Sequence, residues 1–332
     1  MARVQYKLEY SESGAIDNCT IERLRDVFRL SPEEVCSQLD SDLLRYFPEL
    51  FDDPLRVRSI ASVVASFFSM ANWKQGSTIL DVGCGFGLEA MCMRAIGARR
   101  VVGLDVSEGK IRTARSIASM IKSDVQFVQG STLASFEDGA FDGILIKDAL
   151  SHLTEDDSFL AEAARVLSPQ GTLLIIDDRN ALSPMVQWKT RRLWRTCEFG
   201  SLVDMAQIGL TSNYFSIRLE HLATIAPDLS QEDRQRIARR TRGYTNEELP
   251  HFVGSSPKGT RPPVRKVACI NPANGMVQER LLNPLALRSN LNHRGFRSWI
   301  KPFSGRRIVT ALWPLTLPLT SSFCVIGQKL RG

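Results

Sequence analysis

The 332-residue sequence contains no CxxC cysteine pair, no internal repeat and no low-complexity tract. Its seven cysteines, an odd number without metal-ligand spacing, predict free thiols, and no residue is assigned to a metal. Residues 1–10 lack the apolar run of a secretory signal, so a cytoplasmic location is expected. With 43% hydrophobic and 23% charged residues, the composition excludes collagen-like, mucin-like and largely disordered proteins.

One uncharged segment, Ile308–Gln328, is long enough to cross a membrane. Pro314 and Pro318 interrupt it, and several Thr and Ser residues make it partly polar. We therefore favour a loop followed by a buried strand, and contact of this segment with a membrane is the alternative.

Charge is unevenly distributed along the chain. The net charge is +6, but residues 1–180 carry 19 Lys+Arg against 27 Asp+Glu, whereas residues 181–310 carry 21 against 9. A basic block of this kind either binds an anionic partner or forms a solvated face.

Short apolar runs alternate with helical patterns between residues 76 and 180, which is typical of a parallel sheet covered by helices on both faces. Two further strands near the end complete a doubly wound, mainly parallel, seven-stranded Rossmann-like α/β sheet. The predicted strands are Thr78–Val82, Arg100–Asp105, Val125–Val128, Phe141–Ile146, Thr172–Asp177, Phe296–Phe303 and Ser322–Gly327, with helices near 88–97, 108–121 and 157–167.

We expect four regions: a helical N-terminal cover (1–75), a cofactor-binding core (76–180), a substrate-binding insertion or lid after the fifth strand (181–282), and a returning helix with the last two strands (283–332). Capping residues predict helix starts at Ser31-Pro32, Asp53-Pro54, Ser230, Thr245 and Asn283-Pro284. A proline-rich stretch spans 257–263.

The most informative motif is the glycine-rich turn Asp81-Val82-Gly83-Cys84-Gly85-Phe86-Gly87 between a strand and a helix. Glycines let a ligand approach the backbone, and the helix N-terminus adds hydrogen-bond donors. Asp105 ends the next strand, where a carboxylate can accept both ribose hydroxyls. Asp81 would repel a pyrophosphate but suits a cationic ammonium, which favours S-adenosylmethionine over a dinucleotide. A tight turn without a ligand, and helix-capping roles for Asp81 and for Asp105, are the alternatives.

The segments that carry a family resemblance are this turn, Gln129-Gly130-Ser131, the stretch from Phe141 to Leu153 and the stretch from Ala164 to Leu173. Through them, the sequence resembles the class I S-adenosylmethionine-dependent methyltransferases, in the small-molecule group. Ser131 stands where the family often has an acidic residue. The resemblance implies S-adenosylmethionine as cofactor, held by Asp81, Gly83, Cys84, Gly85, Gly87, Asp105, Val106, Ser131, Thr132 and Lys147.

Methyl transfer to a hydroxyl or amine needs a group that removes a proton. His152 and Asp148 follow the fourth strand and Asp178 follows the fifth, where open α/β sheets bind ligands. These three are the catalytic candidates, and helix capping or packing is the alternative for each.

The insertion carries 15 Lys+Arg against 9 Asp+Glu and begins with Trp188, Arg191, Arg192 and Arg195, which are predicted to bind an anionic acceptor. The alternative is an amphipathic helix in which Trp188, Leu193 and Trp194 are packed and the arginines face solvent.

We expect an S-adenosylmethionine-dependent methyltransferase of a small-molecule or carrier-linked metabolite, with O-methylation ahead of C- or N-methylation. The sequence contains no Asn/Asp-Pro-Pro-Tyr/Phe motif, which would favour a nucleic-acid acceptor. A nucleic-acid methyltransferase and a non-catalytic scaffold are the other classes.

Overall fold

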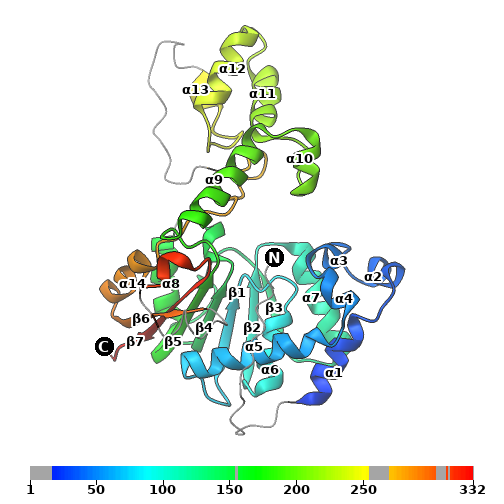
Figure 1. Ribbon diagram of the computed structural model, residues 1–332, viewed down its shortest axis with the longest axis vertical. Coiled ribbons are helices and arrows are strands. Elements are labelled where there is room, and N and C mark those ends of the chain that lie inside the picture. Colours follow the sequence, from blue (N-terminus) through cyan, green and yellow to red (C-terminus); the bar gives the residue numbers. More distant parts are fainter. Residues whose placement is uncertain (1–16, 154–155, 254–268, 304–311, 313–314, 332) are drawn as a thin grey trace.

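The computed structural model describes residues 17–153, 156–253, 269–303, 312 and 315–331. A sheet flanked by helices forms the body of the molecule, and an insertion rises from it as one long helix that carries a group of shorter helices at its far end (Figure 1). The predicted proline-rich stretch at 257–263 lies outside the described residues.

The sheet has seven strands in the order β3-β2-β1-β4-β5-β7-β6. Only β7 runs antiparallel to its neighbours, β5 and β6, so the predicted mainly parallel α/β sheet is confirmed. The strands are β1 (Thr78–Val82), β2 (Arg100–Asp105), β3 (Gln126–Gln129), β4 (Phe141–Lys147), β5 (Leu167–Asp177), β6 (Phe296–Pro302) and β7 (Phe323–Lys329).

Successive side chains of the buried strands point to opposite faces of the sheet, and each face has its own core. Ile79 of β1 packs in the cluster that includes the apolar side chains of the N-terminal helices, α6 (Leu88–Ile96) and α7 (Glu108–Ile121). The next residue, Leu80, packs in the cluster formed with α8 (Asp156–Val166) and α14 (Pro284–His293). The helices therefore cover both faces, as the alternating pattern predicts.

From residue 17, where the described part begins, five helices precede the sheet: α1 (Asn18–Val27), α2 (Pro32–Gln38), α3 (Asp42–Tyr46), α4 (Pro48–Asp52) and α5 (Arg56–Ala71). Ser31 and Glu34 form a capping box at the start of α2, which confirms that predicted start. The predicted start at Asp53-Pro54 is early, because Arg56 and Val57 first donate short-range turn bonds to the carbonyls of these two residues. Trp73 fixes this cover to the sheet, since its ring lies over Gly143 and its Nε1 donates to the Thr172 carbonyl at 3.3 Å.

The described residues of the insertion form the helices α9 (Pro184–Phe199), α10 (Leu202–Gln207), α11 (Tyr214–Ile225), α12 (Gln231–Arg240) and α13 (Pro250–Val253). Ser230 caps α12 as predicted. The helix start predicted at Thr245 is wrong: the Glu248 carboxylate does accept from Thr245 N–H at 2.8 Å, but the segment between them is a turn. The helix begins only at Pro250, a residue suited to a first helical position.

The uncharged C-terminal segment forms the short helix η2 (Leu317–Leu319) and then the buried strand β7 where it is described. This confirms the predicted loop and strand for residues 315–328; residues 308–311 and 313–314 lie outside the described part. Within the described ranges, no helix has the length and apolar character needed to span a membrane.

Candidate functional site

The glycine-rich turn joins β1 to α6 at the carboxyl edge of the sheet, the edge at which the parallel strands end. Gly83 and Cys84 donate their N–H groups to the Leu104 carbonyl at 2.7 and 3.1 Å, which ties the turn to β2. Gly83 and Gly87 have positive φ. A Cβ added at Gly83 would lie 2.4 Å from Ala149, and one added at Gly87 would lie 2.4 Å from Phe127. Gly85 also has positive φ, but a Cβ there would meet nothing within 4 Å. The turn is therefore packed on two sides and open at Gly85.

Asp81 is buried beneath this turn, with 3% of its surface exposed, and its Oδ2 has no hydrogen-bond partner. Burial and the neighbouring charge of Glu89 hold the pKa of Asp81 well above its usual range. A buried carboxyl without a partner is costly unless a cationic group reaches it. The α-ammonium group of S-adenosylmethionine would supply that charge, so this site fits the cofactor that the sequence predicts.

Asp105 lies at the end of β2 beside the same turn. Its Oδ2 accepts from the Gly85 N–H at 2.9 Å, and its Oδ1 accepts from the Ser107 N–H at 2.8 Å. These bonds fix the carboxylate between the turn and α7, while each oxygen retains a lone pair for a hydroxyl of a ribose. The side chain that caps α7 is that of Ser107, not Asp105.

The other predicted cofactor residues lie along this edge. Val106 is exposed after β2, and Ser131 and Thr132 are exposed in the loop after β3. Gly130 N–H donates to the Asp105 carbonyl at 3.0 Å and holds that loop against β2. Cys84 is buried, and burial raises the pKa of its thiol, so its side chain stays a neutral thiol.

Lys147 ends β4 and lies between two carboxylates, 3.2 Å from Glu89 and 3.1 Å from Asp148. Their charges raise the pKa of Lys147. The lysine thereby offsets part of the negative charge that gathers around Asp81. Its position supports an electrostatic role beside the cofactor site.

The catalytic candidates gather at the ends of β4 and β5. Oxygens of Asp148, Asp177 and Asp178 lie within 4.8 Å of one another. Asp177 is buried and accepts from the Ser151 and Arg179 N–H groups at 3.2 and 3.0 Å. Burial and the charge of Asp148 raise the pKa of Asp177 to about 7, and burial also raises the pKa of Asp178. This cluster can therefore hold a proton near neutral pH.

His152 belongs to the short helix η1 (Leu150–His152) after β4 and is exposed. Its Nδ1 lies 3.1 Å from the carbonyl of Val277, an arrangement that places the proton on Nδ1 and leaves the Nε2 lone pair available. Sequence reasoning found His152 but not Val277, because the two are far apart in the chain.

The returning end of the insertion, residues 277–282, lies against η1 and the segment after β5. Arg280 N–H donates to the Ser151 carbonyl at 2.9 Å, and Leu282 N–H donates to the Arg179 carbonyl at 2.8 Å. Glu279 and Arg179 form an ion pair. This part of the insertion, rather than the distant helices α11–α13, borders the candidate catalytic groups (Figure 1).

The raised pKa of Asp177 predicts how stability depends on pH. Between the unfolded value near 3.8 and the folded value of about 7, the folded protein binds more protons, so stability falls as pH rises through this window. The slope should approach ~1.4 kcal/mol per pH unit. Asp177→Asn should remove this slope in urea unfolding at pH 5 and 7, whereas the exposed-site control Asp228→Asn should retain it. Equal slopes in wild type and Asp177→Asn would contradict the prediction.

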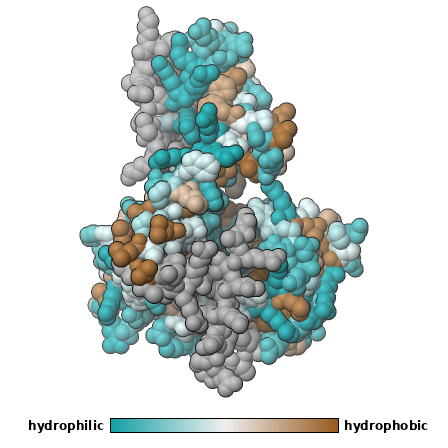
Figure 2. Space-filling model, viewed as in Figure 1, coloured by the Kyte–Doolittle hydropathy of each residue, from teal (hydrophilic) through white to brown (hydrophobic). Residues whose placement is uncertain are grey.

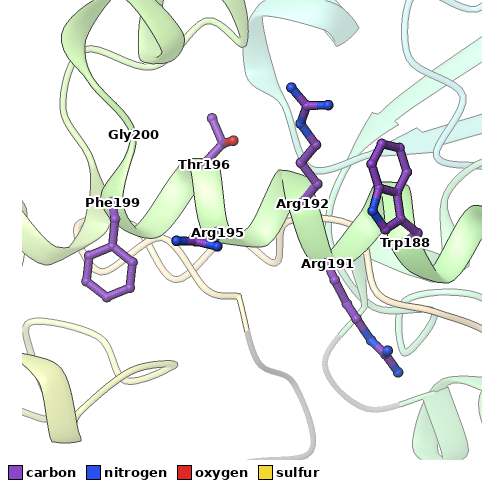
Figure 3. A pocket seen from close by; sticks show the side chains of 7 residues that line it. All are labelled: Trp188, Arg191, Arg192, Arg195, Thr196, Phe199 and Gly200. Atoms are coloured by element: carbon purple, nitrogen blue, oxygen red, sulfur yellow. The ribbon is translucent and has the colours of Figure 1, made fainter.

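The four predicted acceptor-binding residues line one open hollow of about 650 Å³ on α9, together with Thr196, Phe199 and Gly200. Figure 3 shows these side chains on successive turns of the helix. The amphipathic alternative is right in its exposed arginines but wrong for Trp188, which is exposed and has the Arg192 guanidinium 5.6 Å from its ring centroid. Leu193 and Trp194 do pack inward, and Trp194 Nε1 donates to the Glu279 carbonyl at 2.9 Å.

Sequence reasoning missed the contribution of the N-terminal cover to this site. The ring of Tyr46 from α3 lies 5.8 Å from that of Phe86 in the glycine-rich turn, and Lys110 Nζ lies 4.8 Å from the Tyr46 ring. Tyr46 is half exposed, so it lies at the surface beside the turn. No motif marks Tyr46, because the contact depends on how helices distant in sequence pack.

Comparison with known proteins finds similarity to methyltransferases. Residues 80–175 match the protein family described as a methyltransferase domain. A ubiquinone biosynthesis O-methyltransferase of Maricaulis maris is 28% identical over 126 residues, covering 37% of this chain and 49% of the relative. A ribosomal protein L11 methyltransferase of Thermotoga maritima is 33% identical over 126 residues, covering 37% and 46%. A crystal structure of an S-adenosylmethionine-dependent methyltransferase from Archaeoglobus fulgidus has a TM-score of 0.42 at 14% identity and covers 81% of this chain and 94% of the other.

Residues 80–175 thus form a methyltransferase domain, and the site beneath its glycine-rich turn fits S-adenosylmethionine as cofactor. The chain spans about half the length of the curated relatives it matches.

Proposed function

We propose that this protein transfers a methyl group from S-adenosylmethionine to a hydroxyl of a small-molecule or carrier-linked metabolite. The observation that carries the proposal is the unpartnered, buried Oδ2 of Asp81 beneath the opening at Gly85. Support for an oxygen acceptor comes from the Maricaulis maris relative, which is named as an O-methyltransferase of ubiquinone biosynthesis. A quinone-related acceptor is therefore our first candidate.

In this proposal the cofactor lies along the carboxyl edge from β1 to β3. Asp81 binds its ammonium group, and Asp105 accepts from its ribose hydroxyls. The backbone from Gly83 to Gly87 lines the methionine part, while Val106, Ser131 and Thr132 border the adenine. When bound, S-adenosylmethionine supplies a methyl group already activated by a positively charged sulfur.

The proton of the acceptor hydroxyl passes to a group at the ends of β4 and β5. We assign this first to Nε2 of His152, whose other ring nitrogen is engaged by the Val277 carbonyl. Asp178 and Asp148 are the alternative bases in the same cluster. Loss of this proton would let the oxygen bond to the methyl carbon as the methyl–sulfur bond of the cofactor breaks, with S-adenosylhomocysteine as the leaving group. Residues 277–282 help to exclude water from the reacting atoms.

Replacing His152 with glutamine should lower kcat about 100-fold, because general-base catalysis commonly contributes 10²–10⁴-fold. The variant should retain the affinity for S-adenosylmethionine, since His152 lies outside the proposed cofactor contacts. Steady-state kinetics and calorimetry on the same preparation separate the two effects. His293→Gln, which changes an exposed histidine of α14, is the matched control. A His152→Gln enzyme with wild-type kcat would move the assignment to Asp178.

The acceptor side of the site is proposed to include the basic face of α9. This helix begins at Pro184, shortly after β5 ends at Asp177, so its first turns rise from the carboxyl edge. Arg191, Arg192 and Arg195 are exposed and bring positive charge to that side. They would attract an acceptor that carries, or is accompanied by, negative charge.

The name of the Thermotoga maritima relative favours one second candidate, a ribosomal protein as acceptor. Methyl-labelled S-adenosylmethionine distinguishes the two candidates when it is incubated with the protein and either solvent-extracted metabolites or purified ribosomes. Label in an extractable small molecule, with the methyl group on oxygen, supports our proposal. Label retained in ribosomal protein alone would overturn it.

A further inference from the structure

The helix α9 presents a face that no described residue covers. Val186, Thr190 and Cys197 point into the protein. The opposite side carries Met185, Trp188, Arg192, Arg195 and Phe199, spaced three or four residues apart, as expected of one face of a helix. Met185, Trp188 and Phe199 have 65%, 60% and 54% of their surface exposed.

This face continues into the first turn of α10, where Leu202 and Val203 are 74% and 69% exposed. A capping box between Ser201 and Asp204 fixes that turn. Figure 2 shows hydrophobic side chains on the insertion over α10, bordered by hydrophilic ones. We define the α9–α10 face as Met185, Trp188, Phe199, Leu202 and Val203 together with Arg191, Arg192 and Arg195.

The face is held rigidly by charges buried behind it. Glu198 of α9 forms a fully buried ion pair with Arg218 of α11, and Arg218 Nε donates to the Ala238 carbonyl at 3.0 Å. The carboxylate of Glu198 therefore does not neutralise the arginines on the outer side. The nearby carboxylate of Asp204 accepts hydrogen bonds from Ser201. The α9–α10 face consequently combines five exposed apolar side chains with three cationic ones, beside the exposed carboxylate of Asp204.

An exposed apolar surface of this kind marks an interaction site. A second copy of the chain packed on it about a two-fold axis would bring like-charged arginines toward one another. A bilayer with anionic lipids has the complementary chemistry: its headgroups pair with arginine, tryptophan is suited to the interface, and the apolar side chains enter the acyl boundary. The projection of the insertion from the body leaves this helix accessible (Figure 1).

We propose that the α9–α10 face docks the protein on the surface of an anionic lipid bilayer, from which a lipid-dissolved acceptor reaches the catalytic edge. The inference rests on the proposed function only in its last step, since docking itself needs no acceptor. It narrows the acceptor to a molecule that partitions into membranes.

The test is co-sedimentation of the full chain with vesicles of phosphatidylcholine alone or with added phosphatidylglycerol. Binding to the anionic vesicles should be at least 10-fold stronger and should weaken as salt is raised. The double variant Arg191→Gln/Arg192→Gln should bind anionic vesicles ~30-fold more weakly, because each arginine contributes about 5-fold to the affinity. Leu202→Ser/Val203→Ser should lose ~10-fold or more. Arg239→Gln/Arg240→Gln on α12 and the exposed Leu285→Ser on α14 are matched controls that should bind as the wild type does.

Absence of binding to anionic vesicles, or unchanged binding by the Leu202→Ser/Val203→Ser variant, would overturn the inference. A wild-type dimer in light scattering that this variant dissociates would assign the face to a second copy instead. Calorimetry with S-adenosylmethionine on the same preparations keeps the proposals separate. Cofactor binding without vesicle binding would contradict only the docking proposal. Vesicle binding without cofactor binding would contradict only the proposed methyl transfer.

Discussion

Replacing Asp81 with asparagine should weaken S-adenosylmethionine binding by about 100-fold or more. The carboxylate is buried, and breaking a buried ion pair by removing one partner costs ~3–5 kcal/mol. The unliganded protein should not lose stability, because its Oδ2 has no hydrogen bond to lose and Glu89 already disfavours its charge. Calorimetric titration measures the affinity, and thermal unfolding without the cofactor measures the stability.

Asp124→Asn is the matched control for this change. Asp124 is exposed and pairs with Arg94, at the opposite end of α6 from the glycine-rich turn. Its replacement should leave cofactor affinity unchanged. If Asp81→Asn bound S-adenosylmethionine as tightly as the wild type does, the ammonium would lie elsewhere and the assigned site would be wrong.

Replacing Gly85 with alanine should also reduce cofactor affinity by about 100-fold, for a steric reason. The added Cβ projects into the opening where no protein atom lies within 4 Å, and where we place the cofactor. The positive φ of 54° makes alanine cost ~1–2 kcal/mol of folding stability, but the surrounding packing is not disturbed. Calorimetry reports the lost affinity.

Gly76→Ala separates the backbone cost from the steric one. Gly76 also has positive φ, and its Cβ would likewise meet nothing within 4 Å, but it precedes β1 at the other end of the strand. Both variants should lose similar stability, and only Gly85→Ala should lose cofactor. A Gly85→Ala protein that keeps full affinity would show that the cofactor does not approach this backbone.

Local pattern predicted the core of the fold well. The bounds of β1, β2 and α7 match the prediction residue for residue, because apolar strands end abruptly at Asp81-Val82 and Asp105, and Ser107 caps the helix that follows. β5 begins at Leu167, five residues earlier than predicted. Its first residues include Gln170 with positive φ, an irregular start that an apolar-run criterion does not detect.

The insertion was less predictable because its arrangement depends on tertiary contacts. The Ser230 cap locates the start of α12, and the amphipathic alternative for the Trp188–Arg195 segment describes α9, but neither reveals that α9 extends away from the sheet (Figure 1). The sequence also leaves Trp188 either packed in the protein or exposed on the helix. Only the burial of the opposite face of α9 in the structure decides between the two. The division into a cover, a core, a lid and a returning segment remains our proposal, with the lid function assigned mainly to residues 277–282.

For the site, the sequence identified side chains at strand ends because parallel strands bring their carboxyl ends to one edge. Asp81, Asp105, Asp148 and Asp178 were located in this way. The partners that determine their chemistry were not, since Glu89 acts through space on Asp81 and Val277 reaches His152 from the end of the insertion. Such pairings follow from packing rather than from spacing along the chain.

The most direct test of the account is the binding of S-adenosylmethionine to the full chain, measured by isothermal calorimetry beside S-adenosylhomocysteine. We predict one site per chain for both ligands, with binding lost in Asp81→Asn and kept in Asp124→Asn. A folded wild-type protein that produces no heat with either ligand, and retains neither through gel filtration, would contradict the central claim.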